Sequence, residues 1–128
     1  MAVPLTRYKV QRDKERDLRY ALREIRRAID AYKDAADAQK FQIKVGTEGY
    51  PESLEQLVEG VTMSTSADGS KIKFLRRIPI DPMTGKAEWG VRSMQDDPKS
   101  QSWGGQNVFD VYTKTLERAR NGTPYAEW

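Results

Sequence analysis

The sequence predicts an α+β fold, in which a long N-terminal helix packs on a small antiparallel β-sheet, with a short second helix and a loop-rich C-terminus. Three observations lead to this prediction: a helical apolar stripe in the first third of the chain, a short capped helical segment in the middle, and two strand-like segments further on. A chain of 128 residues suffices for one modest core. We therefore expect a single domain over residues 1–128, with the helix at 5–41 and a globular α/β head at 42–128.

The apolar stripe of the first helix follows the helical period of 3.6 residues. It consists of Leu18, Leu22, Ile25, Ile29, Tyr32 and Ala36. The opposite face carries the charged residues Arg23, Arg27, Asp30 and Asp34. Arg26 stands four residues before Asp30, a spacing that predicts an ion pair along the helix.

The first half of this helix has a different composition from the second half. Residues 11–17 read QRDKERD and contain no apolar side chain. A helix that is polar all round has no face to bury against its own domain. We therefore expect the first half to project away from the head.

The head begins with a short helix and contains two strands. Ser53 is a candidate N-cap for a helix at 53–58, because Gln56 follows it three residues later. Residues 62–69 form a polar loop with an Asp-Gly turn, and strands are expected at 88–93 and 108–113. Trp89 is expected in the core, whereas Trp103 could belong either to the core or to a contact with a partner. The aromatic tail NGTPYAEW is expected to fold back onto the body.

The segment LRRIPIDPMTGKAEWG, residues 75–90, connects helix to sheet, and its residue types restrict the backbone conformation of the connection. Pro79 and Pro82 fix their own φ angles and disfavour helix in the residue before each, which predicts an extended crossing. Asp81 could be a catalytic acid, but no partner base accompanies it. We therefore interpret Asp81 as a turn residue that accepts hydrogen bonds from nearby backbone N–H groups.

The composition excludes several kinds of chemistry. The chain has no Cys and no His, which removes thiol catalysis, Cys/His zinc sites and the commonest general base. No nucleophile with an adjacent base stands out, so we expect no enzyme, no catalytic residues and no cofactor. No stretch of about 18 apolar residues is present, so the chain as given does not cross a membrane.

Several short segments carry a family resemblance when they are taken together and in order. They are an opening Ala-Val-Pro before the long helix, YPESLEQLVEG at 50–60, FLRRIPIDPMTG at 74–85, WG at 89–90, VFDVYT at 108–113 and TPYAEW at 123–128. This combination resembles the type II secretion pseudopilins, most closely their major, G-like class within the type IV pilin-like family. The resemblance extends from Ala2 to Trp128.

The resemblance implies a structural function. Members of the family begin with an apolar segment, and a prepilin peptidase cleaves just before it. The segment anchors the subunit in the inner membrane and later forms the filament core. This chain starts where that segment, of about 20 residues, would end. The implied protein has a periplasmic head. Its partners are copies of itself, other pseudopilins and inner-membrane components of the secretion system, and its filament drives protein export. A type IV pilus or a specialised secretion-like system is an alternative setting for the same subunit.

One segment departs from the family pattern. Major pseudopilins follow the last strand with an acidic loop that binds calcium, and the corresponding residues here, 113–122, read TKTLERARNG. Their only carboxylate is Glu117, whereas calcium takes six to eight oxygen ligands. We therefore expect no calcium site in this loop. Asp96 and Asp97 are another possible source of ligands, although two adjacent acids in a loop are more often solvated.

A nucleic-acid-binding module, or a ligand-binding one, that starts at Met1 in the cytoplasm is an alternative from another functional class. The long helix is rich in Arg, but five acids are interspersed in it. They are Asp13, Glu15, Asp17, Glu24 and Asp30. From this mixture we expect no cleanly positive face and no nucleic-acid partner.

The sequence also suggests where subunits would touch. Asp30 and Asp34 on the exposed helix face are complementary in charge to Arg76 and Arg77 in the connecting segment. We therefore predict that these four residues form ion pairs between subunits of a filament.

Overall fold

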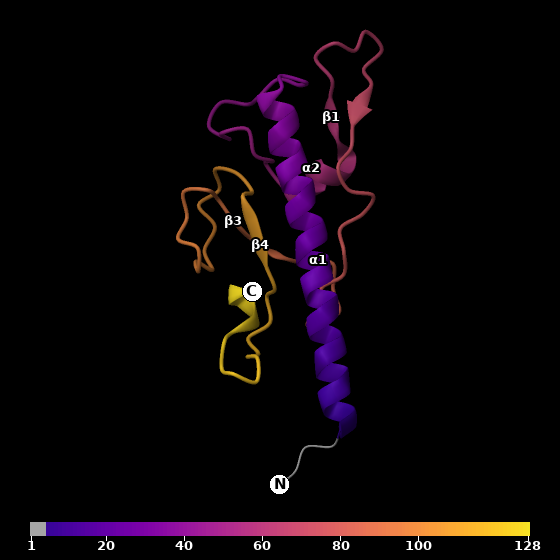
Figure 1. Cartoon of the computed structure of the whole chain (residues 1–128). Coiled ribbons are helices and arrows are strands. Elements are labelled where there is room, and N and C mark those ends of the chain that lie inside the picture. The colour runs from indigo at the N-terminus through magenta and orange to yellow at the C-terminus, as the bar shows by residue number, and fades with distance from the viewer. Residues whose placement is uncertain (1–4) are drawn as a thin grey trace.

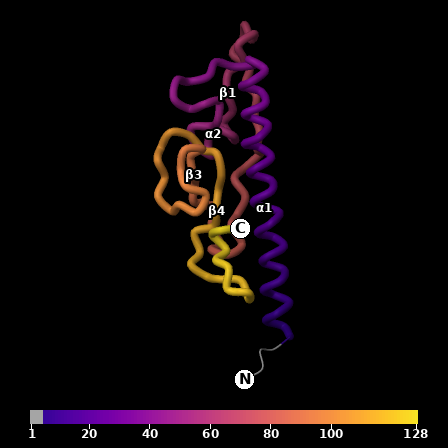
Figure 2. Tube along the Cα trace, turned by 60° about the vertical axis from the view of Figure 1, so that its left-hand side comes forward, coloured from indigo at the N-terminus to yellow at the C-terminus, as the bar shows by residue number. Residues whose placement is uncertain are grey.

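The computed structural model describes residues 5–128 and shows a rod-like helix (Figure 1), with the rest of the chain along one side of it in the turned view (Figure 2). Helix α1 spans Leu5–Asp37, 33 residues, which corresponds to a length of about 50 Å. Nine of its residues are buried, and the six residues of the predicted stripe are among them. The expected α+β class is confirmed: a long N-terminal helix, a short second helix and small antiparallel sheets.

Helix α1 ends four residues earlier than the predicted boundary at residue 41. The chain reverses at Gln39, whose φ angle of 59° lies in the left-handed region. This reversal turns Phe41 back into the core, where its ring lies 4.7 Å from that of Tyr32, centroid to centroid. The apolar Phe41 therefore packs beyond the end of the helix instead of extending it.

The second helix, α2, spans Leu54–Glu59 and begins at the predicted cap. The Ser53 hydroxyl oxygen accepts a hydrogen bond from the Gln56 backbone N–H at 3.2 Å. The Gln56 side chain in turn accepts from the Glu52 backbone N–H at 2.8 Å, one residue before the position in a standard capping box. Leu54 and Leu57 are buried against the core around α1.

A two-stranded hairpin that the sequence analysis did not predict follows α2. Strand β1, Val61–Thr62, pairs antiparallel with β2, Lys71–Ile72, and residues between them form the expected polar loop. Asp68 organises the turn, because its carboxylate accepts hydrogen bonds from the side chains of Ser66 and Ser70 and from the Ser70 backbone. These bonds lower the pKa of Asp68 to about 2.

The two predicted strands form a second, separate sheet. Strand β3, Gly90–Arg92, pairs antiparallel with β4, Asp110–Tyr112, in the register Gly90–Tyr112 and Arg92–Asp110. Gly90 is required by this pairing, since a Cβ atom there would lie 2.1 Å from the Tyr112 ring. Strand β4 packs on α1, and the 3-10 helix η1, Tyr125–Glu127, packs beside β4.

The C-terminal tail folds back along the first half of α1, as the two views show (Figures 1 and 2). Tyr125 is buried, and its hydroxyl accepts a hydrogen bond from the Gln11 side chain at 2.9 Å. The Arg120 guanidinium lies 4.6 Å from the centroid of the Tyr8 ring. The prediction that the first half of α1 projects away from its own head is therefore wrong, because the tail supplies partners for its polar side chains.

Candidate functional surface

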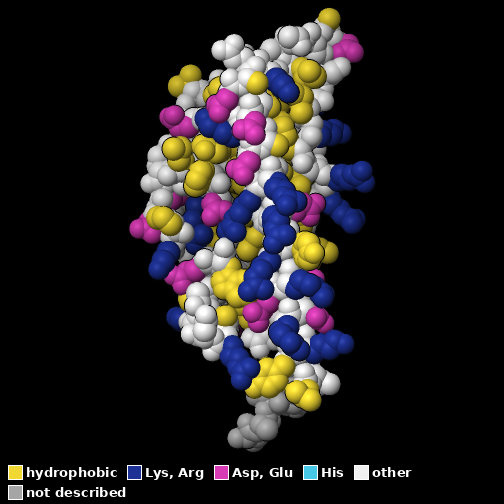
Figure 3. Space-filling model, in the orientation of Figure 1, with side chains coloured by type: hydrophobic (Ala, Val, Ile, Leu, Met, Phe, Trp, Pro, Cys, Tyr) yellow, Lys and Arg dark blue, Asp and Glu magenta, His cyan; other side chains and the backbone are white. Residues whose placement is uncertain are grey.

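The exposed face of α1 is sorted by charge along its length. Eight side chains at spacings of three or four residues share this face, five arginines first and three aspartates after them. In order they are Arg12, Arg16, Arg19, Arg23, Arg27, Asp30, Asp34 and Asp37, and all are exposed. We call them the charged row. Figure 3 shows basic side chains gathered along the visible face of the helix.

The expectation that no face of the helix is cleanly positive holds at Arg16, which contacts two acids, but the arginine line between residues 12 and 27 contains no acid of its own. The acids of this region are interspersed in the sequence, but at 100° per residue they fall beside the arginine line and not within it. Among the arginines of the charged row, Arg16 contacts two acids. Its guanidinium nitrogens lie 3.6 Å from a carboxylate oxygen of Asp13 and 3.4 Å from one of Asp17.

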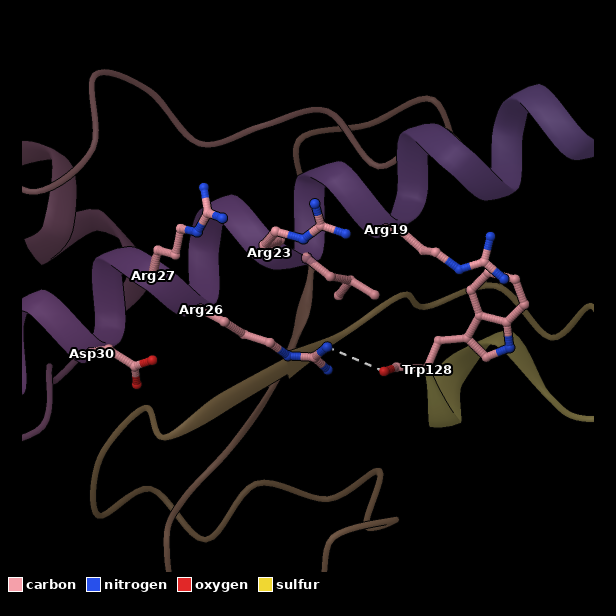
Figure 4. Close-up of a pocket in the computed structure, with 7 residues that line it drawn as sticks. Arg19, Arg23, Arg26, Arg27, Asp30 and Trp128 are labelled. Carbon is pink, nitrogen blue, oxygen red and sulfur yellow. Dashed lines mark hydrogen bonds between the residues drawn. The ribbon is translucent and has the colours of Figure 1, made fainter.

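Two open grooves flank α1. The first lies between the helix and the C-terminal tail and has a volume of about 470 Å³ (Figure 4). Its lining consists of Arg19, Leu22, Arg23, Arg26, Arg27, Asp30 and Trp128. The second groove lies between the helix and the connecting segment before β3. Its lining consists of Tyr20, Arg23, Glu24, Arg27, Ala28, Ala31, Phe74, Leu75 and Arg76.

Two arginines of the first groove bind the head. Arg26 Nε donates to Asp110 Oδ1 at 2.7 Å, and its two Nη atoms donate to the carbonyl oxygens of Trp128 and Val111. The predicted Arg26–Asp30 pair is therefore wrong: a half-buried carboxylate and two carbonyls of the head are better partners than an exposed helix neighbour. Arg19 stacks on the Trp128 ring at 4.3 Å from its centroid.

The remaining arginines of this groove, Arg23 and Arg27, make no ion pair within residues 5–128. Figure 4 shows their guanidinium groups extending from the helix away from β4, whereas Arg19 and Arg26 reach the tail. Their charge is thus available to an anionic partner.

The four residues predicted at the subunit interface are all exposed. Asp30 and Asp34 lie on the charged row, and Arg76 and Arg77 lie in the connecting segment between β2 and β3. Asp30 lines the first groove and Arg76 the second, so the structure does not bring them together within one subunit. No ion pair joins any two of the four in the part of the chain that the structure describes.

Asp81 has the structural contacts that its place between two prolines suggests. Its side chain is fully buried, with one carboxylate oxygen accepting from the Met83 N–H at 2.9 Å and the other from the Thr113 hydroxyl. Its backbone N–H donates to the Lys86 carbonyl at 2.8 Å. Asp81 thereby closes the turn at 81–86 and attaches it to the residue that follows β4.

The other acidic candidates close loops. Asp96 accepts hydrogen bonds from the backbone N–H groups of Ser93 at 2.8 Å and Gly104 at 3.0 Å, and these donors lower its pKa. Asp97 accepts from the Lys99 N–H at 2.9 Å. Within residues 5–128 no group of three or more acidic, His or Cys side chains could hold a metal ion.

The aromatic candidates divide between core and surface. Trp89 is buried and donates its indole N–H to the Pro79 carbonyl at 2.8 Å, as a core role requires. Trp103 is 44% exposed, although its indole N–H donates to the Asn107 carbonyl at 2.7 Å. Trp128 packs edge-on against Tyr125, as expected for a tail that folds back.

Sequence reasoning missed one buried charge, Arg92 on β3. It is 4% exposed, donates to the carbonyls of Ser100 at 2.6 Å and Ala126 at 3.2 Å, and lies over the Tyr112 ring. Its hydrogen-bond partners lie 8 and 34 residues further along the chain, at no regular helical or strand spacing, so no local pattern distinguishes this arginine from a surface one. Arg92 joins the sheet, the loop after β3 and the tail.

Comparisons of the chain with protein-family models, with curated proteins and with solved structures found no match. In the described part of the chain, no helix is long and apolar enough for a membrane crossing.

Proposed function

We propose that this chain is a structural, non-catalytic subunit of a type II secretion pseudopilus. In this proposal the native subunit is anchored in the inner membrane, keeps its head in the periplasm, and polymerises with itself and with other pseudopilins. The resemblance of the sequence segments to this family supports the proposal. A type IV pilus subunit is the alternative within the same family.

The observation that carries the proposal is the two-sided use of α1. One stripe of the helix is buried against its own head, while the opposite face, with the charged row, is open along its length. If the face meets the head of the next subunit, the contact is heterologous and does not close, so it produces a filament.

The predicted ion pairs specify that contact. Asp30 and Asp34 of one subunit would meet Arg76 and Arg77 of the next. All four are exposed and have no ion-pair partner within residues 5–128. An exposed pair contributes about 0.2–1 kcal/mol. The same pairs recur at every subunit, so their effect on a polymer accumulates.

Analysis of the native protein tests the family assignment. The protein is recovered from the membrane fraction of its own cells, and its intact mass and N-terminus are determined. We expect an additional apolar segment of about 20 residues that begins with an N-methylated Phe. A native protein that starts at Met1 and remains in the soluble fraction would refute the assignment.

A charge reversal tests the interface. We expect Asp30→Arg to abolish filament assembly in cells, and the triple variant Asp30→Arg with Arg76→Asp and Arg77→Asp to restore it. Glu59→Arg is the matched control, because Glu59 is an exposed acid at the end of α2, outside the charged row. Failure of the compensating change to rescue assembly would exclude these pairs while leaving the filament itself open.

A further inference from the structure

One end of the molecule combines exposed apolar side chains with a local excess of basic ones. It is formed by the first turns of α1, residues 5–14, and by the loop at 116–121 after β4. The two segments lie side by side at the lower end of the molecule in both views (Figures 1 and 2). We call this end the basic pole.

The loop of the basic pole has a defined conformation. The Ala119 N–H donates to the Thr123 carbonyl at 2.7 Å, and the Gly122 N–H donates to the Ala119 carbonyl at 2.8 Å. The stacking of Arg120 on Tyr8 ties the loop to α1. Whatever the loop presents to the outside is therefore held in place by the fold.

The basic pole presents three apolar side chains to solvent. Leu116 is 89% exposed, Leu5 is 85% exposed and Val10 is 53% exposed. A single exposed leucine is ordinary on a protein surface. Here the side chains come from two segments that are more than 100 residues apart in the sequence and that the Arg120–Tyr8 contact joins at one end of the molecule.

The same segments carry six basic residues and two acidic ones. The basic residues are Arg7, Lys9, Arg12, Lys14, Arg118 and Arg120, and the acidic ones are Asp13 and Glu117. None of the six basic side chains is in an ion pair within residues 5–128. Asp13, by contrast, lies 3.6 Å from Arg16, which partly neutralises it. The excess positive charge of this end is consequently available to an anionic partner.

We propose that the basic pole docks on the surface of a membrane that contains anionic phospholipids. Lys and Arg bind the headgroup phosphates, while Leu116, Leu5 and Val10 enter the boundary between headgroups and acyl chains. A nucleic acid would satisfy the charges but would leave the exposed leucines in water. The docking goes beyond the proposed function, because it uses only side chains of this chain and needs no anchoring segment.

The opposite end of the molecule provides a matched control. Val45, in the loop after α1, is 99% exposed, and Lys40 and Lys44 lie near it in the sequence. At this end two lysines are paired with acids, since Lys44 lies 3.5 Å from Glu52 and Lys33 lies 3.0 Å from Asp37. An exposed apolar side chain without excess positive charge is not expected to bind a membrane.

Vesicle co-sedimentation of the 128-residue chain tests the proposal. We expect binding to vesicles of phosphatidylcholine mixed with phosphatidylglycerol, weaker binding as salt increases, and none to phosphatidylcholine alone. The double variant Arg7→Gln with Lys9→Gln should weaken binding by about 25-fold, since each basic residue near the surface contributes about fivefold. Leu116→Ser should weaken binding as well. Val45→Ser and Lys40→Gln with Lys44→Gln should leave it unchanged.

Several results would overturn the proposal. The anionic vesicles could fail to bind the chain at low salt, or the control variants could weaken vesicle binding as much as the variants of the basic pole do. A further such result is retention on duplex DNA that competes with the vesicles, depends on Arg7 and Lys9, and is insensitive to Leu116→Ser, which would make the pole a nucleic-acid surface. All substituted side chains are exposed, and circular dichroism checks that the variants remain folded. The outcome does not depend on the native N-terminus, so this proposal and the family assignment can fail separately.

Discussion

The two halves of α1 belong to one continuous helix, but they are attached to the head by different forces. In the second half, nine residues between Leu18 and Ala36 are buried, and burial of each large apolar side chain contributes about 1.5–3 kcal/mol. In the first half, the attachment consists of the Gln11–Tyr125 hydrogen bond and the stacking of Arg120 on Tyr8. A net hydrogen bond contributes about 0.5–1.5 kcal/mol. Burial therefore secures the second half, whereas a few polar contacts hold the first.

The largest effect is expected from the second half. Ile25 is fully buried at the centre of the stripe, so Ile25→Ala removes apolar contacts and leaves a cavity. We expect a loss of about 2–5 kcal/mol in the free energy of unfolding, measured by chemical denaturation. The matched variant is Val10→Ala in the half-exposed first half, for which a change within about 0.5 kcal/mol is expected. Equal losses for the two variants would contradict the comparison.

A smaller and local effect is expected from the first half. Gln11→Ala removes the donor to the Tyr125 hydroxyl and should reduce stability by about 0.5–1.5 kcal/mol. Amide hydrogen exchange resolves where the loss occurs, and it should accelerate in residues 5–17 while residues 18–36 remain protected. Uniform acceleration along the whole helix would show that the two halves unfold together.

An effect confined to high pH is expected from Tyr32. Burial, reinforced by the Glu52 carboxylate, raises the pKa of Tyr32 to about 12 from an ordinary value of 10.0. The folded protein therefore holds this proton more tightly than the unfolded chain, so the contribution is complete below pH 10 and is lost between pH 10 and pH 12. Tyr32→Phe keeps the aromatic packing with Phe41 and Phe74 and should flatten the decline of stability in this range. If the decline of stability is unchanged in Tyr32→Phe, other titratable groups cause it.

Local patterns in the sequence were sufficient for most of the fold. The stripe of α1, the cap at Ser53 and the centres of β3 and β4 all follow from short-range periodicity or spacing, and the structure has each of them. The hairpin of β1 and β2 escaped prediction because each strand has only two residues, too few to show alternation.

Long-range partners could not be predicted from local spacing. Arg26 binds Asp110, 84 residues away, instead of its helical neighbour Asp30, and Gln11 binds Tyr125, 114 residues away. The first contact depends on where β4 lies against α1 and the second on where the tail lies, and no local pattern specifies either position.

The candidate surface was predicted in part. Asp30, Asp34, Arg76 and Arg77 are exposed, although their pairing between subunits stays a prediction. The arginine line of the charged row could have been found from the sequence by placing residues 12–27 around a helix at 100° intervals. A count of acids along the sequence does not separate the faces of the helix, and for this reason it did not reveal the arginine line.

The attachment of α1 also determines how the molecule would respond to mechanical force. A pull on the N-terminal end of the helix, directed along its axis, would load the few contacts of the first half, which rupture at low force. Beyond Leu18 the same pull runs parallel to the buried stripe, so many contacts bear the load in shear at once. Arg26, fastened to Asp110, Val111 and Trp128, clamps the helix to β4 and the tail within this shear zone. We therefore expect the first half of α1 to detach from the head at a low force, while the second half stays attached and transmits the force to the head.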